Sequence, residues 1–199
     1  MKKVVFVGSG AIGTAVGNVL ARKGVDDITL LSIEEEVVES INNLRYNLTY
    51  FPNVKLSRNL KATTDINVLR DADVVFMAIP STAVVGYLIS NKEYINPKSI
   101  IVNLAKGFGK CDSLIPNCLQ DQFPNPLMMM KGPSFAREII NRQDTGFTLA
   151  CSDNQYFSEV SELFENTNVR FDFSNDITGV ELASILKNIY AIIIGMLDA

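Results

Sequence analysis

The sequence predicts an α/β fold built on a doubly wound, mostly parallel sheet. Short and almost uninterrupted apolar runs, such as DVVFMAI (73–79) and SIIVNL (99–104), alternate with stretches of helix length along the 199 residues. Strands that are apolar throughout are typical of a parallel sheet covered by helices on both faces. In addition, the first apolar run leads directly into three glycines at turn spacing, which suits the turn from a first strand into a first helix.

The predicted elements follow the chain in regular order. Strands are expected at 3–7, 28–31, 73–79, 99–104, 126–130 and 145–150. Helices are expected at 11–23, 34–43, 81–90, 112–120, 134–141, 154–165 and 178–197. A polar stretch at 172–178 is the candidate boundary between a first domain (1–177) and a last helix (178–199).

Composition excludes several classes of function. Eighteen basic residues against 22 acidic residues give a net charge of −4, which argues against a nucleic-acid surface and against an anionic membrane surface. No apolar segment is long and uninterrupted enough for a membrane span, since Lys187 and Asn188 break the best candidate. No membrane span and no nucleic-acid partner are therefore expected.

Histidine is absent and the three cysteines, Cys111, Cys118 and Cys151, form no CxxC pair. We therefore expect free thiols in a reducing, cytoplasmic compartment and no metal site. Acid–base chemistry would then fall to Lys, Glu, Asp or Tyr.

The glycine pattern predicts a dinucleotide site. In GSGAIG (8–13) the first glycine permits a tight turn, the second lets the backbone approach a pyrophosphate, and the third allows close packing of helix on strand. The amide groups at the start of the next helix would hold the phosphates. A charged start and an apolar run also outline a secretory signal, but a second strand follows at the right distance for a βαβ unit. The prediction is a Rossmann-type sheet; a structural glycine turn in a flavodoxin-like sheet is the alternative.

The end of the second strand bears on the choice of cofactor. Ser32 and Ile33 stand where an acid usually receives the ribose hydroxyls, and the acids follow at Glu34–Glu36 with no basic residue near this turn. Three carboxylates should repel a 2′-phosphate, so NAD is favoured over NADP. The simpler interpretation is that the glutamates only begin a helix, where acids suit the dipole.

Three later strands end in IPS (79–81), NLAKG (103–107) and KGPS (131–134), so Lys106 and Ser134 offer donors at the carboxyl edge of the sheet, where ligands bind in such folds.

The last helix is apolar nearly all round, as expected of a buried helix. One narrow stripe of it is polar or small: Glu181, Ser184, Lys187, Asn188, Ala191 and Gly195. This stripe is either a functional face or the exposed face of an amphipathic helix.

Several motifs together resemble the NAD(P)-dependent glycerol-3-phosphate dehydrogenase family. They are GSGAIGTA at the start, YFPNVKL (50–56), ATTD (62–65), DADVVFMAIPS (71–81), NLAKG (103–107), GPSFAREI (132–139) and GVELASILKN (179–188). The last two are the most specific, and the resemblance covers essentially the whole chain.

The resemblance implies hydride transfer between C2 of glycerol 3-phosphate and a nicotinamide, which gives dihydroxyacetone phosphate. It makes Lys187 the proton acceptor and Lys106 a contact to substrate and cofactor, both catalytic. The expected cofactor-binding residues are Gly8, Ser9, Gly10, Ala11, Ile12, Gly13, Ser32, Ile33, Pro80, Lys106 and Ala136. The expected substrate-binding residues are Lys106, Gly132, Ser134, Lys187 and Asn188. Ile33 with two glutamates after it resembles the members that use NAD.

Family members continue into an all-helical domain that completes the site, so residues 178–199 would be its first helix. On this expectation the chain alone binds nucleotide and turns over glycerol 3-phosphate poorly or not at all. A homodimer is compatible with the sequence. A ketopantoate-type 2-keto acid reductase and a nucleotide sensor without chemistry are the alternatives; YFPNVKL and GPSFAREI count against the first, and a lysine on an apolar helix against the second.

Overall fold

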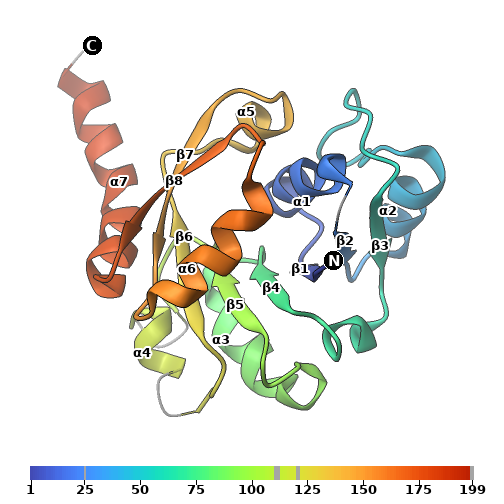
Figure 1. Cartoon of the computed structure of the whole chain (residues 1–199). Coiled ribbons are helices and arrows are strands. Elements are labelled where there is room, and N and C mark those ends of the chain that lie inside the picture. Colours follow the sequence, from blue (N-terminus) through green and yellow to red (C-terminus); the bar gives the residue numbers. More distant parts are fainter. Residues whose placement is uncertain (25, 110–112, 120–121, 198–199) are drawn as a thin grey trace.

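One mixed sheet carries the fold of the described residues. The computed structural model describes residues 1–24, 26–109, 113–119 and 122–197, without the side chains of Asn188, Ala191 and Leu197. The strands are β1 (Lys3–Val7), β2 (Asp27–Leu31), β3 (Leu60–Thr63), β4 (Val74–Met77), β5 (Ile100–Asn103), β6 (Leu127–Lys131), β7 (Thr145–Ala150) and β8 (Val169–Ser174). They lie in the order β3-β2-β1-β4-β5-β6-β7-β8 (Figure 1).

The first six strands in this order are parallel, whereas β7 runs antiparallel to β6 and pairs in parallel with β8. The order 3-2-1-4-5 is that of a Rossmann-type sheet and differs from the flavodoxin-like order. The predicted fold class is confirmed, and the flavodoxin-like alternative is excluded.

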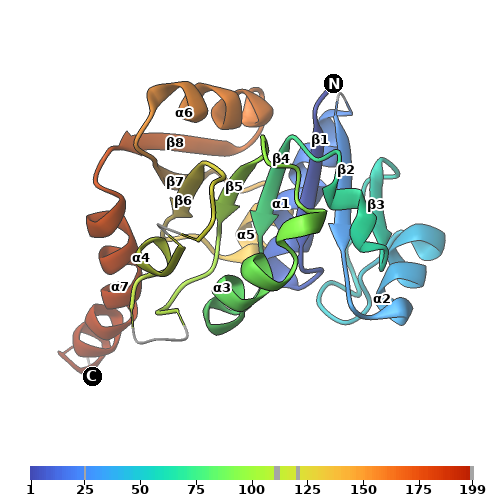
Figure 2. The ribbon, with the colours of Figure 1, turned by 90° about the horizontal axis from the view of Figure 1, so that it is seen from below.

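Helices cover both faces of the sheet (Figures 1 and 2). They are α1 (Ala11–Lys23), α2 (Glu35–Glu39), α3 (Ser81–Ser90), α4 (Ile115–Leu119), α5 (Ala136–Ile140), α6 (Asn154–Ser161) and α7 (Ile177–Leu197). Apolar side chains of α1, α2, α5 and α6 form one core against the sheet, and those of α3 and α4 form a second core on the opposite face. The sheet is therefore buried on both faces, which is why its central strands are apolar throughout.

Strand β1 packs tightly against its neighbour β4, and helix α1 packs tightly against β2. Phe6 of β1 stacks on Phe76 of β4 with ring centroids 4.6 Å apart, and Phe164 meets Phe76 edge-on. At Gly17 in α1, an added Cβ would stand 3.0 Å from the Leu30 side chain of β2, so the missing side chain lets helix and strand approach closely. This packing fixes the position of the loop between β1 and α1.

Two strands are missing from the sequence prediction. β3 is a four-residue edge strand, and β8 alternates polar and apolar residues, so neither has the long apolar run of a central strand. The predicted boundary at 172–178 begins inside β8, which ends at Ser174. The helix predicted over 34–43 is a short α2 followed by a π-helical turn, Ser40–Leu44.

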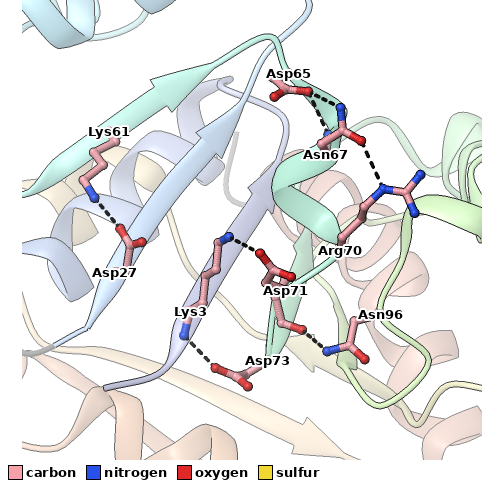
Figure 3. Close-up of polar contacts among 10 residues, drawn as sticks. Lys3, Asp27, Lys61, Asp65, Asn67, Arg70, Asp71, Asp73 and Asn96 are labelled. Carbon is pink, nitrogen blue, oxygen red and sulfur yellow. Dashed lines mark hydrogen bonds and ion pairs between the residues drawn. The ribbon is translucent and has the colours of Figure 1, made fainter.

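Polar contacts on the surface join β2 to β3, and β1 to the segment that follows β3 (Figure 3). Lys3 Nζ lies 3.3 Å from Asp71, and Lys61 Nζ lies 2.7 Å from Asp27 on the neighbouring strand. Asp65 begins a 3₁₀-helical turn, Ile66–Leu69, by accepting a hydrogen bond from the Asn67 amide at 2.9 Å. Exposed ion pairs of this kind contribute about 0–1 kcal/mol each, so they add little to the stability of the sheet.

Helix α7 differs from the expected buried helix. Its first turns pack on β6 and β7, whereas apolar side chains along the rest of it are exposed: Leu182, Leu186, Ile189, Tyr190, Ile192, Ile193, Ile194 and Met196. By length and composition it could also cross a membrane, with 20 residues and a mean hydropathy of 1.6. The expectation that α7 is buried all round is wrong, because only its polar side faces the sheet.

Candidate functional site

Three cavities line the carboxyl-terminal edge of the parallel strands. The first, of about 480 Å³, opens between the loops after β1 and β2. The second, of about 450 Å³, shares Ala78, Ile79 and Pro80 with it and continues towards the ends of β5 and β6. The third, of about 240 Å³, lies between β6 and α7. Carboxyl-terminal strand ends are the ligand-binding edge of open α/β sheets.

The glycine loop has the geometry that its sequence predicts. Gly8 has φ +111°, and a Cβ there would lie 2.6 Å from the Ala78 carbonyl oxygen. A Cβ on Gly13 would collide with the Gly8 carbonyl oxygen. These two glycines are therefore required by the fold itself.

Gly10 is different, because nothing in the fold requires it to lack a side chain. The nearest atom to an added Cβ belongs to the Tyr50 ring at 3.9 Å, and φ is an ordinary −68°. Gly10 caps α1 without a side-chain hydrogen bond, and the first turn of α1 carries no acidic residue. The amide groups at this helix terminus thus remain available to an anion in the first cavity.

A buried hydrogen-bond network holds the loop in shape. Asn47 donates from Nδ2 to the Ser9 carbonyl oxygen at 2.8 Å and to Thr14 Oγ1 at 2.9 Å. Thr14 Oγ1 donates to the same carbonyl at 2.9 Å, and the hydroxyls of Ser9 and Ser32 are 2.7 Å apart. Asn47 and Thr14 are fully buried. The sequence prediction missed Asn47. Its polar side chain is the only sign in the sequence of a contact between this segment and the glycine loop.

The end of β2 forms one wall of the first cavity. Ser32, Ile33 and Glu34 line it, and Ile33 is 97% exposed. The Ser32 hydroxyl accepts a hydrogen bond from the Glu34 amide at 3.1 Å. Among the described residues that line this cavity there is no Lys or Arg. The wall is therefore neutral to acidic.

The second cavity brings together residues predicted from three separate motifs. Pro80, Lys106, Ser134 and Ala136 line it together with Ala11 and Ile12 of the glycine loop. Lys106 Nζ lies 3.5 Å from the Ser134 carbonyl oxygen. The Ser134 hydroxyl is buried and has no hydrogen-bond partner among the described residues, which fits a site that a polar ligand completes.

Partial burial lowers the pKa of the Lys106 amine, and the nearby ammonium groups of Lys187 and Lys131 lower it further. All three lysines therefore stand within electrostatic reach of one another. Such a cluster favours an anionic ligand and gives Lys106 an amine that releases its proton more readily than an exposed lysine does.

The third cavity is lined by Lys131, Gly132, Ser184 and Lys187, among others. The Lys187 ammonium lies 5.2 Å from the centre of the Phe135 ring, which belongs to the second cavity, so Lys187 stands between the two cavities. A Cβ on Gly132 would meet the Gly146 carbonyl oxygen of β7 at 2.5 Å, so close packing on β7 by itself requires this glycine. The side chain of Asn188 lies outside the described residues.

The polar stripe of α7 begins on the buried side of the helix. Glu181 and Ser184 are buried against the sheet, and Glu181 Oε2 lies 3.0 Å from Lys131 Nζ of β6. The alternative in which this stripe is the exposed face is therefore wrong for these two residues. Lys131 and Glu181 had not been assigned roles from the sequence, because a lysine at the end of an apolar strand gives no sign of its partner.

The part of the chain that the structure describes contains no group of three or more Cys, Asp or Glu side chains arranged to hold a metal ion. Cys118 and Cys151 are free thiols, while Cys111 falls outside the described residues.

Comparisons with known proteins point to one family. Residues 3–157 match the family model described as the NAD-dependent glycerol-3-phosphate dehydrogenase N-terminus. A glycerol-3-phosphate dehydrogenase [NAD(P)+] of Leptospira biflexa is 37% identical over 98% of this chain and 60% of its own length. The Bacillus subtilis protein of the same name is 35% identical over 100% of this chain and 59% of its own.

A solved structure of glycerol-3-phosphate dehydrogenase from Coxiella burnetii superposes with a TM-score of 0.89 at 30% identity, covering 99% of this chain and 61% of that one. The chain thus spans about 60% of the length of the relatives that it matches.

Proposed function

We propose that this chain, which belongs to the NAD-dependent glycerol-3-phosphate dehydrogenase family, is the cofactor-binding part of an enzyme that oxidises glycerol 3-phosphate at C2 to dihydroxyacetone phosphate. The observation that carries the proposal is the glycine loop, which opens onto two adjoining cavities at the carboxyl edge of the sheet. The two cavities share Ala78, Ile79 and Pro80, and their linings extend from the end of β2 to Met130 of β6.

The residues present fit NAD. Gly10 leaves the amino terminus of α1 open to a pyrophosphate, and the unpartnered Ser134 hydroxyl lies in the second cavity. The cofactor-binding residues we propose are Gly8, Ser9, Gly10, Ala11, Ile12, Gly13, Ser32, Ile33, Pro80, Lys106 and Ala136, all of which are in or next to these cavities.

NAD, rather than NADP, is the proposed cofactor. The wall formed by Ser32, Ile33 and Glu34 has no basic side chain that could neutralise a 2′-phosphate. A phosphate there would stand near the Glu34 carboxylate with no compensating cation, which costs binding free energy.

The chemistry that follows is a balanced oxidation. When bound, NAD supplies the acceptor for the hydride that leaves C2. Lys187, on α7, accepts the proton of the C2 hydroxyl. Lys106, in the loop that follows β5, orients the substrate. Gly132 and Ser134 would contact the substrate from the end of β6, with Asn188 beside Lys187 on α7. The lysine cluster attracts the anionic phosphate of the substrate into this region.

We further propose that residues 1–177 are the dinucleotide-binding domain, with 178–199 the first helix of a helical catalytic domain. The direct packing of α7 on β6 and β7 supports a helix that joins the two parts. A cytoplasmic location is supported by the free thiols of Cys118 and Cys151. A homodimer remains part of the proposal and is tested by light scattering.

The test is a calorimetric titration of the 199-residue chain with NADH and, separately, with NADPH. We expect saturable NADH binding at least about tenfold tighter than NADPH binding, which corresponds to ~1.4 kcal/mol. Preference for NADPH would contradict the interpretation of the β2 wall. Binding of neither would contradict the proposed cofactor site. A parallel assay with glycerol 3-phosphate and NAD measures whether the 199-residue chain alone oxidises this substrate.

A further inference from the structure

A buried ion pair joins α7 to the sheet next to the proposed catalytic lysines. Lys131 Nζ at the end of β6 lies 3.0 Å from Glu181 Oε2 in the second turn of α7, and the two side chains are 3% and 0% exposed. Apart from this pairing, no donor among the described residues hydrogen-bonds to the Glu181 carboxylate. Each charge therefore depends on the other, because an isolated buried charge is strongly unfavourable.

The same ammonium also reaches the loop that follows β5. Lys131 Nζ donates a hydrogen bond to the Ala105 carbonyl oxygen, in the residue immediately before Lys106. One lysine thus connects three segments that are far apart in sequence: the loop that carries Lys106, the end of β6, and the helix that carries Lys187.

Few other contacts hold α7. It packs mainly on β6, with a smaller contact to β7, and six residues after Glu181 it presents Lys187 between the second and third cavities. The apolar residues from Ile189 to Met196 whose side chains are described are exposed. The position of Lys187 relative to Lys106 consequently depends on the first turns of α7, where Glu181 is the buried charged group.

We propose that Lys131 and Glu181 are a positioning pair: their ion pair fastens α7 and the Lys106 loop to the end of β6 and so sets how Lys106 and Lys187 stand relative to each other. The role we assign to both residues is to position Lys106 and Lys187, although Lys131 also lines the third cavity. The inference deepens the proposed function, on which it rests for the roles of Lys106 and Lys187. Its observations, however, are independent of any cofactor or substrate.

The charge of Lys131 has a second consequence. It is one of the two ammonium groups that lower the pKa of the Lys106 amine, the other being Lys187. Removing it while keeping the packing should raise the pKa of Lys106. An exchange that keeps the positive charge should not. If Lys131 only filled space, removing its charge and keeping its charge would have the same effect on the pKa of Lys106.

The test compares Lys131→Met/Glu181→Gln, which removes both charges at nearly constant volume, with the charge-preserving Lys131→Arg. The double variant avoids leaving one buried charge without a partner. Lys98→Met is the matched control, because Lys98 is exposed and its ammonium forms no ion pair or side-chain hydrogen bond among the described residues. Amide exchange in β1 and β4 verifies that the sheet stays folded in every variant.

Two readouts are measured by peptide mapping on the full 199-residue chain without ligands. The first is the yield of a cross-link between Lys106 and Lys187, formed by a reagent with two amine-reactive ends and a short spacer. The second is the rate of acylation of Lys106 as a function of pH. In the double variant we expect a lower yield of the cross-link, and slower acylation of Lys106 near neutral pH because the pKa of its amine rises when the Lys131 charge is removed.

Lys131→Arg should retain the wild-type acylation profile, and Lys98→Met should retain both readouts. An unchanged cross-link and an unchanged profile in the double variant would overturn the proposal. So would a Lys131→Arg variant that behaves like the double variant. Failure of the wild-type chain to bind NADH would instead contradict the proposed function, and it would leave the positioning pair standing.

Discussion

The glycine loop and helix α7 are held in place in very different ways. Around the loop, the side chains of Ser9, Thr14 and Asn47 are buried and hydrogen-bonded to one another or to the backbone. On α7, apolar side chains are exposed and one buried ion pair carries the polar contact with the sheet. The glycine loop therefore owes its shape to residues before β3, whereas the position of α7 depends on its packing against β6 and β7 and on one buried ion pair among the described residues.

This difference predicts that the two regions respond differently to substitutions on α7. Cofactor binding at the loop should survive changes on α7. The relative placement of Lys106 and Lys187 should not. Purified variants of the same chain, altered in one region or the other, test that separation.

The largest effect is expected from Lys131→Met alone. It leaves the Glu181 carboxylate buried without a counterion, and breaking a buried pair in this way costs roughly 3–5 kcal/mol. We expect about 3 kcal/mol, because α7 can separate from the sheet and return Glu181 to water. Chemical denaturation measures the loss, and the Lys131→Met/Glu181→Gln variant should recover part of it. Equal stability of Lys131→Met and wild type would contradict a buried ion pair.

Gly13→Ala should come next. The added Cβ collides with the Gly8 carbonyl oxygen and stands 3.0 Å from the Ala78 side chain, and forced contacts of this kind cost about 1–3 kcal/mol. We expect a matching fall in the free energy of unfolding, together with weaker NADH binding, since the loop itself must shift. A variant as stable as wild type would show that α1 does not pack as described.

Gly10→Ala should reverse that pattern. Without bound ligand, the space around Gly10 accommodates the added methyl group. The free energy of unfolding should therefore change by less than about 0.5 kcal/mol. NADH binding should weaken about tenfold, because the methyl group occupies the approach to the α1 terminus. Gly86→Ala is the control: its Cβ meets nothing within 4 Å in α3, and binding should be unchanged. Undiminished NADH affinity in Gly10→Ala would place the phosphates elsewhere.

The smallest effect belongs to Asp65 at the surface. A hydrogen bond from the Asn67 amide lowers the pKa of the Asp65 carboxyl, so the ionised form is the stabilising one. Its contribution is present above the carboxyl pKa of the unfolded chain and is lost as pH falls through the lower pKa of the folded state. Asp65→Ala should therefore lower Tm slightly at neutral pH and leave Tm unchanged in strong acid. A decrease in Tm of equal size at both pH values would contradict this cause.

The sequence predicted the parts of the fold that local pattern determines. The apolar runs of β1, β2, β4, β5, β6 and β7 and the three glycines of the first turn were sufficient to predict the central strands of the sheet and the turn from β1 into α1. β3 and β8 escaped because edge strands are short or alternate in polarity, and those patterns also fit loops. Lys106 and Ser134 could be placed at one edge because both follow parallel strands.

The sequence did not reveal the environment of side chains that depends on distant partners. Glu181 was placed on a polar stripe, but its burial follows from Lys131, fifty residues earlier in the chain. Asn47 lies in a segment without regular structure, and its two hydrogen bonds reach back to the first loop. The expected burial of α7 was wrong because hydrophobicity alone does not specify which neighbour covers a helix.

Amide hydrogen exchange of this chain with and without saturating NADH tests the central claim most directly. We predict slower exchange at Gly8–Gly13, around Ser32–Glu34 and at the start of α3, which border the two cavities. The ion-paired amino edge around Lys3 and Lys61 should be unaffected. Protection confined to that opposite edge, or to α7 alone, would contradict a dinucleotide site at the carboxyl edge of the sheet.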